Sequence, residues 1–257
     1  MACDIRLLGA LVLSPYRAKL KPPLEVVVMT IMGFDRIRIK ENGKLHYQNN
    51  KWQNVLVVLI NMLIVGGVQV IVRVSGDNWF VAMFISLVSI AASLLVVNII
   101  AMGTMTWFHR SIKTEGLKME EMFWPFKEDY GGNVLMMFLI ALYTALWSML
   151  FVIPGIVKGY SYSLAIYIKS ENPNIPASKA IELSKKMTDG RKMDLFVLDL
   201  SFIGWGILSA LTLNILGILY VIPYQYAAKA FAYEEIKEEA LANQKVSEAE
   251  LFGYANL

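Results

Sequence analysis

Four long stretches without a charged residue constrain the fold of this chain more than any other feature. The uncharged stretches are Val55–Val72, Phe80–Phe108, Asn133–Val157 and Leu200–Ala228. A helix needs about 20 predominantly apolar residues to cross the hydrocarbon core of a bilayer. Three of the stretches reach that length, and the first falls just short unless Trp52–Asn54 is added. Several such runs in one chain of 257 residues predict an all-α, polytopic membrane protein rather than a soluble domain.

Composition agrees with this prediction and excludes several kinds of site. Charged residues make up 18% of the chain, whereas soluble globular chains carry about 25%. The formal net charge of +3 gives no electrostatic argument for nucleic-acid binding. Cys3 is the single cysteine, and His46 and His109 are the two histidines. The sequence therefore predicts no disulfide framework, no metal site and no cofactor.

The N-terminal segment Met1–Thr30 does not match the rest of the chain. It mixes polar and apolar residues with prolines that would interrupt a signal-peptide core or a spanning helix. The codons for Leu24–Val26 can contain a ribosome-binding sequence at a natural distance from Met29. We therefore expect translation to start at Met29 or Met32, which makes residues 1–30 a non-native extension. The intact mass of the native protein tests this expectation.

The distribution of basic residues predicts six passes arranged as three hairpins. Lys158–Lys192 contains seven Lys and Arg, which places this connection in the cytoplasm by the positive-inside rule. Two passes are then needed between Phe108 and that connection. Because Asn133–Lys169 is short for two full crossings, we expect one or both of these passes to be broken or re-entrant. The predicted membrane domain covers residues 31–237, with spans at 52–73, 79–108, 132–152, 154–169, 194–213 and 215–233. Both termini are cytoplasmic in this scheme, the first hairpin turns at Ser75–Asn78, and residues 234–257 form an acidic cytoplasmic tail.

Two segments between the spans are predicted to form amphipathic helices that lie in the membrane interface. Lys113–Asp129 carries apolar residues at spacings of three and four, which place them on one helical face. Asn174–Gly190 has a proline in its first turn and a glycine stop, which are typical of a helix. Its basic side is suited to anionic headgroups, and a solvated cytoplasmic linker helix is an equal alternative. The candidate lipid contacts are Lys179, Lys185, Lys186, Arg191 and Lys192.

An ordered series of short motifs gives the chain a family resemblance. The motifs are Leu146-Trp147-Ser148, Ile153–Ile156, Tyr160–Ser163, Ala180-Ile181 with Ser184, Met187 and Gly190, Leu200–Trp205 and Ile222–Tyr224. In this order, from about Ile39 to Lys237, the chain resembles a bacterial membrane family called domain of unknown function nine hundred and seventy-five. That family is distantly similar to YciC-like membrane proteins. The resemblance implies a multi-pass protein of the bacterial inner membrane and supplies no activity.

The sequence departs from the family pattern at two places. Lys179 stands where an acidic residue often precedes the Ala-Ile pair, and Ala232-Tyr233 replaces the usual Phe-Tyr near the end of the resemblance. Neither change disturbs the architecture that the resemblance implies.

Six residues are candidates for a functional role. Asp199 lies in the fifth predicted span. An acidic group inside a membrane helix is costly and often functional, which suits a role in transport or in a proton relay. The more frequent alternative is a carboxylate that lies at the interface or is paired with a neighbouring group. Lys158 follows a Pro-Gly break whose freed carbonyls could gather around a ligand, although extension of its side chain to the interface explains it as well. Pro154-Gly155 and Pro223-Tyr224 form matched breaks, which mark either a transport site or ordinary kinks.

Motifs of enzymes are missing from the sequence, and His109 lies at a membrane edge with no evident partner. We therefore expect a non-enzymatic, membrane-organising or accessory component. Its expected partners are the bilayer, with anionic headgroups on the cytoplasmic face, and a membrane protein or a second copy of the chain. The alternative is a channel or transporter of a small solute or lipid that uses the proline-broken helices. An intramembrane enzyme comes third.

Overall fold

The computed structural model describes residues 34–72 and 79–253, and these residues form helices and connecting turns with no strand. The predicted all-α class is confirmed. The expected extension 1–30, the start sites Met29 and Met32, and the turn Ser75–Asn78 lie outside the described residues, as do the last four residues. The helices are α3 Arg36–Asn49, α4 Lys51–Val72, α5 Trp79–Ala92, η2 Ser93–Val97, α6 Asn98–Ser111, η3 Met119–Phe123, α7 Trp124–Lys127, α8 Tyr130–Leu150, α9 Val152–Tyr162, α10 Ala165–Glu171, α11 Ala177–Met187, α12 Lys192–Leu200, α13 Ile203–Leu211, η4 Gly217–Val221, α14 Ile222–Ala242 and α15 Glu248–Phe252.

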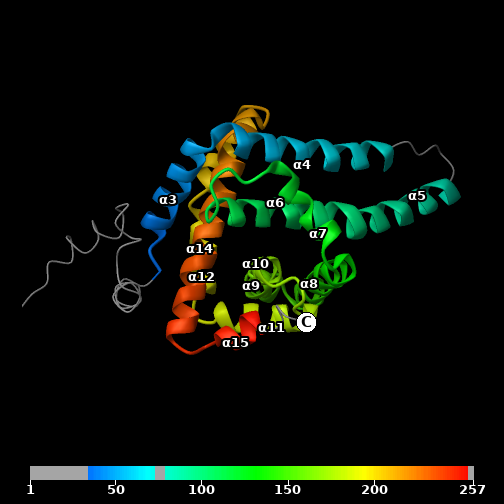
Figure 1. Ribbon diagram of the computed structural model, residues 1–257. Coiled ribbons are helices and arrows are strands. Elements are labelled where there is room, and N and C mark those ends of the chain that lie inside the picture. Colours follow the sequence, from blue (N-terminus) through cyan, green and yellow to red (C-terminus); the bar gives the residue numbers. More distant parts are fainter. Residues whose placement is uncertain (1–33, 73–78, 254–257) are drawn as a thin grey trace, which may run out of the picture.

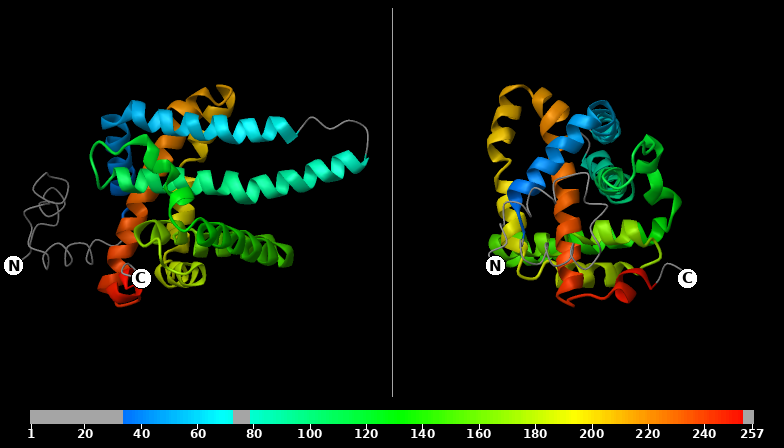
Figure 2. Two further views of the ribbon diagram at one scale, coloured as in Figure 1. Left: turned by 45° about the vertical axis from the view of Figure 1, so that its right-hand side comes forward. Right: turned by 60° about the vertical axis from the view of Figure 1, so that its left-hand side comes forward.

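Three helical segments in the described part of the chain are long and apolar enough to cross a membrane. They are Phe80–Ser111, Tyr130–Leu150 and Lys192–Leu211, and a shorter apolar helix covers Lys51–Gly67. Helices α5, η2 and α6 follow one another directly and form the first of the three. In Figures 1 and 2, α4 and α5 project from the other helices as a hairpin. The length and composition of these segments support membrane association.

The predicted fourth and sixth spans differ from the helices that the structure contains. Residues 154–169 are divided between α9 and α10, which have 11 and 7 residues and are too short to cross a bilayer singly. Residues 215–233 are divided between η4 and α14, and α14 continues to Ala242 with many buried side chains. The prediction of six full passes is therefore not supported at these two places.

Helix α14 forms the centre of the helix bundle. It packs beside α3 in Figure 1 and also contacts α4, α6 and α11. Close approach is permitted by small residues, because a Cβ atom on Gly43 would lie 2.9 Å from the backbone nitrogen of Ala228. Pro223 lies where the π-helix η4 passes directly into α14, so the ring interrupts the hydrogen-bond pattern at this junction. The last predicted span is thus largely a core helix.

Lys113–Asp129 is not one amphipathic helix, which corrects the expectation from its apolar spacing. The segment contains the short helices η3 and α7, and Met122 and Trp124 are buried. The η3 backbone lies directly on α6, since a Cβ atom on Gly103 would come within 1.8 Å of the Met122 carbonyl oxygen. This tight contact bends the segment around α6 and prevents a continuous helix.

The acidic C-terminal segment packs against the bundle. Helix α14 passes through residue 234 without a break, so no structural boundary lies there. After α14 the chain turns, and Val246 and Leu251 enter the same hydrophobic core as the apolar side of α11. The Asn172 side chain donates a hydrogen bond to the Leu251 carbonyl oxygen at 2.9 Å. These contacts hold α15 against α11.

Candidate functional site

One face of α14 carries four polar side chains at intervals of four residues. Gln225, Lys229, Tyr233 and Lys237 share this face because residues four apart lie above one another on a helix. They meet two carboxylates from other helices, Asp199 of α12 and Glu171 of α10. We call these four residues and their two carboxylates the polar stripe.

Asp199 occupies one end of the polar stripe and is fully engaged in local contacts. It accepts hydrogen bonds from the Tyr160 hydroxyl at 3.0 Å and from Gln225 Nε2 at 3.2 Å. Its other neighbour is Lys229, whose Nζ lies 3.0 Å from Asp199 Oδ1. Of the two interpretations drawn from the sequence, this geometry is that of a locally paired carboxylate.

A small cavity of about 60 Å³ opens beside the Asp199–Lys229 pair. Its polar walls come from Tyr160, Ser163 and Tyr167 as well as from the ion pair, and its apolar walls from Met105, Leu164, Leu195 and Leu198. Tyr167 is 2% exposed, and its buried hydroxyl has no hydrogen-bond partner among the described residues. The cavity is therefore lined by the charged pair and by part of the Tyr167 side chain, whose hydroxyl oxygen is itself fully buried.

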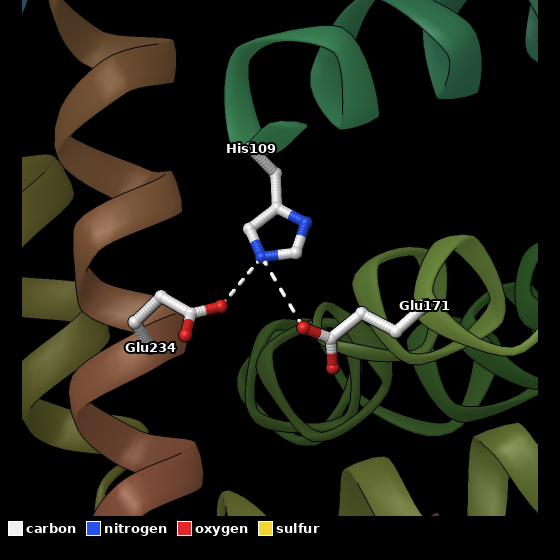
Figure 3. A group of neighbouring side chains, drawn as sticks. All are labelled: His109, Glu171 and Glu234. Atoms are coloured by element: carbon white, nitrogen blue, oxygen red, sulfur yellow. Dashed lines mark hydrogen bonds and ion pairs between the residues drawn. The ribbon is translucent and has the colours of Figure 1, made fainter. Parts of the chain in front are cut away.

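At the other end of the polar stripe, Glu171 and Glu234 face His109 and two lysines. His109 Nε2 lies 2.5 Å from Glu234 Oε1 and 3.7 Å from Glu171 Oε1, as Figure 3 shows. Lys113 contacts both carboxylates, at 2.5 Å from Glu171 and 2.8 Å from Glu234. Lys237 does so too, at 2.6 Å and 3.1 Å. The expectation that His109 has no partner is wrong, because α14 and α10 bring two acidic side chains to the end of α6.

The same three side chains have the composition of a metal site. Ligand atoms of His109, Glu171 and Glu234 all lie within 4.8 Å of one another. However, the ammonium groups of Lys113 and Lys237 already contact the carboxylate oxygens. The charges of the two glutamates and the two lysines sum to zero. A divalent cation would therefore meet no excess of negative charge at this site, and it would have to displace the ammonium groups to reach the carboxylates. The arrangement is chemically that of a buried ion-pair network.

Charge pairing also sets the protonation of the acidic groups in this network. Burial alone would raise the pKa of Glu234, but the hydrogen bond to His109 and the nearby charge of Lys237 outweigh burial and lower that pKa to about 2. The pKa of Glu171 is also lowered, because Lys237 and Lys113 outweigh the effect of burial. Both carboxylates are therefore ionised at neutral pH.

The Pro-Gly break forms a tight helical hairpin between α8 and α9. Phe151 is extended between the two helices, and Pro154 and Gly155 lie in the first turn of α9. An open groove of about 320 Å³ runs along this hairpin beside Ser148 and Gly155. Lys158 lies over the ring of Trp147, with Nζ 4.7 Å from the ring centre. Close packing accounts for the break, and Lys158 does not join the Asp199 contacts.

Replacing Gly155 by alanine is expected to lower the free energy of unfolding by about 1–3 kcal/mol, because the site has no room for a methyl group. The added Cβ atom would lie 2.1 Å from Ser148 Oγ and 2.8 Å from Ser148 Cα. Gly159→Ala is the matched control, since its Cβ atom would lie 4.0 Å from the nearest neighbouring side chain, that of Thr144. Denaturant unfolding in micelles measures both variants. Equal stability of the two would show that α8 and α9 do not pack this closely.

The second break has a different surrounding from the first. Pro223 begins α14, and Tyr224 is buried among aromatic rings, 5.0 Å from Phe202 and 5.6 Å from Tyr220 between ring centres. These two residues lie in the first turn of the helix that carries the polar stripe, and the Tyr224 ring packs against other aromatic rings. The matched breaks predicted from the sequence therefore lie in separate surroundings.

The basic residues of the α11 region contact acidic residues of the C-terminal segment. Lys186 Nζ lies 2.9 Å from Glu250 of α15, and Lys179 Nζ lies 3.5 Å from the same carboxylate. Arg191 forms two parallel hydrogen bonds to Glu239, at 2.8 Å and 2.9 Å. Lys185 lies over the Tyr162 ring, and Lys192 is 3.7 Å from Asp189. Lys185 and Lys192 are thus the least strongly paired of the five candidate lipid contacts.

Comparison with known proteins gives one match, and it covers the whole polar stripe. No curated protein and no solved structure matches the chain. The matched segment begins at the end of α8 and extends almost to the end of α14, so it includes Asp199, Glu171 and the four stripe residues of α14. Residues 150–240 match the family model described as Protein of unknown function (DUF975), which is the family that the sequence motifs resemble.

Proposed function

We propose that the protein is a non-enzymatic, multi-pass membrane protein that organises or assists other components at the surface of a bilayer. The observation that supports this most is the separation of its side chains into an apolar exterior and an internally paired set of charges. Phe151, Ile153 and Leu211 are 74%, 75% and 77% exposed, as suits contact with lipid. The charged side chains of the polar stripe, in contrast, pair with one another.

The count of basic residues in the connections supports an orientation of the protein in the membrane. In our proposal, α11, α15 and the end of α14 lie on the cytoplasmic side of a bacterial cell membrane, together with both termini. Lys185 and Lys192 then face anionic headgroups, since basic side chains beside a membrane surface are attracted to acidic lipids. A membrane protein or a second copy of the chain is the further partner.

Acetylation of lysines in the reconstituted full-length protein tests this proposal. We expect Lys185 and Lys192 to react several-fold more slowly in vesicles that contain anionic lipid than in zwitterionic vesicles, because bound headgroups shield the amines. Lys179 and Lys186 are internal controls, because Glu250 contacts both of them whatever the lipid. Peptide mass spectrometry gives the four rates. Equal rates for Lys185 and Lys192 in the two lipids would contradict headgroup binding.

A second candidate function, transport of a very small solute or of protons, is favoured by the cavity beside Asp199. The charged pair Asp199–Lys229 and the side chains of Tyr160 and Ser163 line this cavity. Its volume of about 60 Å³ is far below the roughly 300–1,000 Å³ of pockets for ordinary small molecules. Only water, protons or a solute of similar size would use this cavity as it stands.

A further inference from the structure

The turn between α13 and η4 presents large apolar side chains to its surroundings. Leu211, Leu213 and Ile215 are 77%, 88% and 59% exposed. We call residues 211–215 the apolar turn, and it lies at the top of Figure 1, in orange, at one end of the helix bundle. Large apolar side chains that are exposed together mark a surface that contacts a partner or a membrane. The apolar turn is therefore a candidate contact surface.

The backbone of the apolar turn is strained at Leu213. Leu213 and Asn214 have φ angles of 50° and 66°. This left-handed region is visited by asparagine but is unfavourable for leucine, because the Cβ atom comes too close to the following carbonyl oxygen. Leu213 is 88% exposed, so packing within the described part of the chain does not compensate for the strain. Such strain indicates that the leucine makes a compensating contact outside the chain.

The polar groups of the apolar turn are bonded to one another. The Asn214 N–H donates to the Ser209 carbonyl oxygen at 2.8 Å, and the Ser209 hydroxyl donates to Asn214 Oδ1 at 2.9 Å. Thr212 Oγ1 accepts from the Leu216 N–H at 3.3 Å. The N–H groups of residues 213 and 215 donate to carbonyl oxygens three residues earlier, at 3.3 Å and 3.0 Å. Backbone in contact with lipid needs such internal partners, since hydrocarbon offers none.

The length of the hairpin limits how deep the apolar turn reaches. The Asp199–Lys229 pair joins α12 to α14, and charged groups are least costly near the headgroups. Beyond this pair, α13 has 9 residues, which rise by about 14 Å, whereas the hydrocarbon core is roughly 30 Å thick. Helices α12 and α13 together are apolar and long enough to cross, but only α13 lies beyond the ion pair. From the headgroup level, α13 thus reaches about halfway across.

We propose that the apolar turn inserts among the lipid acyl chains and that the α13–α14 hairpin enters and leaves the bilayer on one side. This re-entrant hairpin takes the place of the two passes that the sequence predicts at 194–213 and 215–233. The inference rests on the proposed membrane location and adds to it the partner of this turn, which is lipid hydrocarbon. Its apolar exterior, its internally bonded polar groups and its length all suit that partner.

Electron paramagnetic resonance of a nitroxide at Leu213→Cys tests the insertion. The full-length protein carries Cys3→Ser, which removes its one natural cysteine, and is reconstituted in vesicles of phosphatidylcholine and phosphatidylglycerol. Oxygen concentrates in hydrocarbon, whereas a nickel chelate stays in water. We expect collisions with oxygen to exceed those with nickel several-fold at Leu213, as at the control Leu87→Cys on α5, which is 65% exposed. Asn243→Cys, exposed at the end of α14, should show the reverse.

Reaction with a membrane-impermeant maleimide distinguishes a re-entrant hairpin from two passes. We expect neither Leu213→Cys nor Asn243→Cys to react when the reagent is added outside intact bacterial cells. Reaction of Leu213→Cys alone would place the turn at the opposite surface and overturn the re-entrant hairpin. Leu211→Cys is a second position for both measurements, because it lies in α13 and avoids the strained site.

The controls separate this inference from the proposed function. A Leu213 label that favours nickel while Leu87 favours oxygen would put the apolar turn in water and overturn the inference alone. A Leu213 label shielded from both reagents would identify a protein partner or a second copy as the occupant, and would overturn lipid in that role. If Leu87 also favoured nickel, the proposed membrane location would fail, and the inference with it.

Discussion

Replacing Lys169 by methionine is expected to lower the free energy of unfolding by about 1.5–3 kcal/mol, because it removes a buried ammonium group that donates three hydrogen bonds. The Lys169 side chain is 0% exposed. Its Nζ donates to Asp129 Oδ2 at 2.6 Å and to the carbonyl oxygens of Pro173 and Ile175 at 2.6 Å and 2.7 Å. Methionine fills a similar volume but donates no hydrogen bond, so the two carbonyl oxygens and the partly exposed Asp129 carboxylate lose their donor.

Denaturant titration in micelles, followed by far-ultraviolet circular dichroism, measures this loss. Lys158→Met is the matched control, since Lys158 is also a lysine of the α9–α10 region but lies over Trp147 on the hairpin groove. We expect the control to lose less than about 1 kcal/mol, as is usual for a cation on an exposed ring. Equal losses in the two variants would show that Lys169 does not hold the end of α10 to the start of α8.

The long apolar helices could be predicted from the sequence because the requirement for crossing a membrane is local. A run such as Phe80–Phe108 has no charge, and its helices α5, η2 and α6 follow without interruption. The role of α14 could not be predicted in the same way. Residues 215–233 are apolar on average, yet the helix is held in the core by tertiary contacts with α3 and α6 that no local pattern specifies.

The candidate site could be predicted only in part for the same reason. Asp199 stands out as an acid in an apolar run, but its partner Tyr160 is 39 residues away in the chain. His109 and Glu234 are separated by 125 residues and meet only because α6 and α14 pack together. One signal was present in the sequence: Gln225, Lys229, Tyr233 and Lys237 recur at the helical interval of four, which indicates a polar face on a helix otherwise rich in alanine.

Acidification from pH 4.5 to about pH 2 is expected to destabilise the protein through Glu234 by about 3 kcal/mol. The pKa of Glu234 falls from an ordinary value of 4.5 to about 2 in the folded protein, since the hydrogen bond to His109 and the charge of Lys237 outweigh burial. An acid with a lowered folded-state pKa stabilises the fold fully above its unfolded value. That stabilisation is lost as the pH falls through the folded value, because protonation removes the charge that His109, Lys113 and Lys237 contact.

Melting temperatures measured across this pH window assign the loss to a residue. Glu234→Gln should be less stable than the wild type at neutral pH, and it should lose less stability on acidification. The acid-induced loss that is still seen in this variant is expected to come from Glu171, whose pKa is also lowered. Glu235→Gln is the neighbouring control. Burial raises the pKa of Glu235 despite its contact with Arg38. Protonation of this carboxyl at low pH therefore does not lower the stability of the fold. If Glu234→Gln lost as much stability as the wild type, the ion-pair network would not be what holds α6, α10 and α14 together. If the acid-induced loss were reduced in Glu234→Gln while Glu235→Gln behaved as the wild type, the network would be a structural junction whose strength depends on the charge of Glu234.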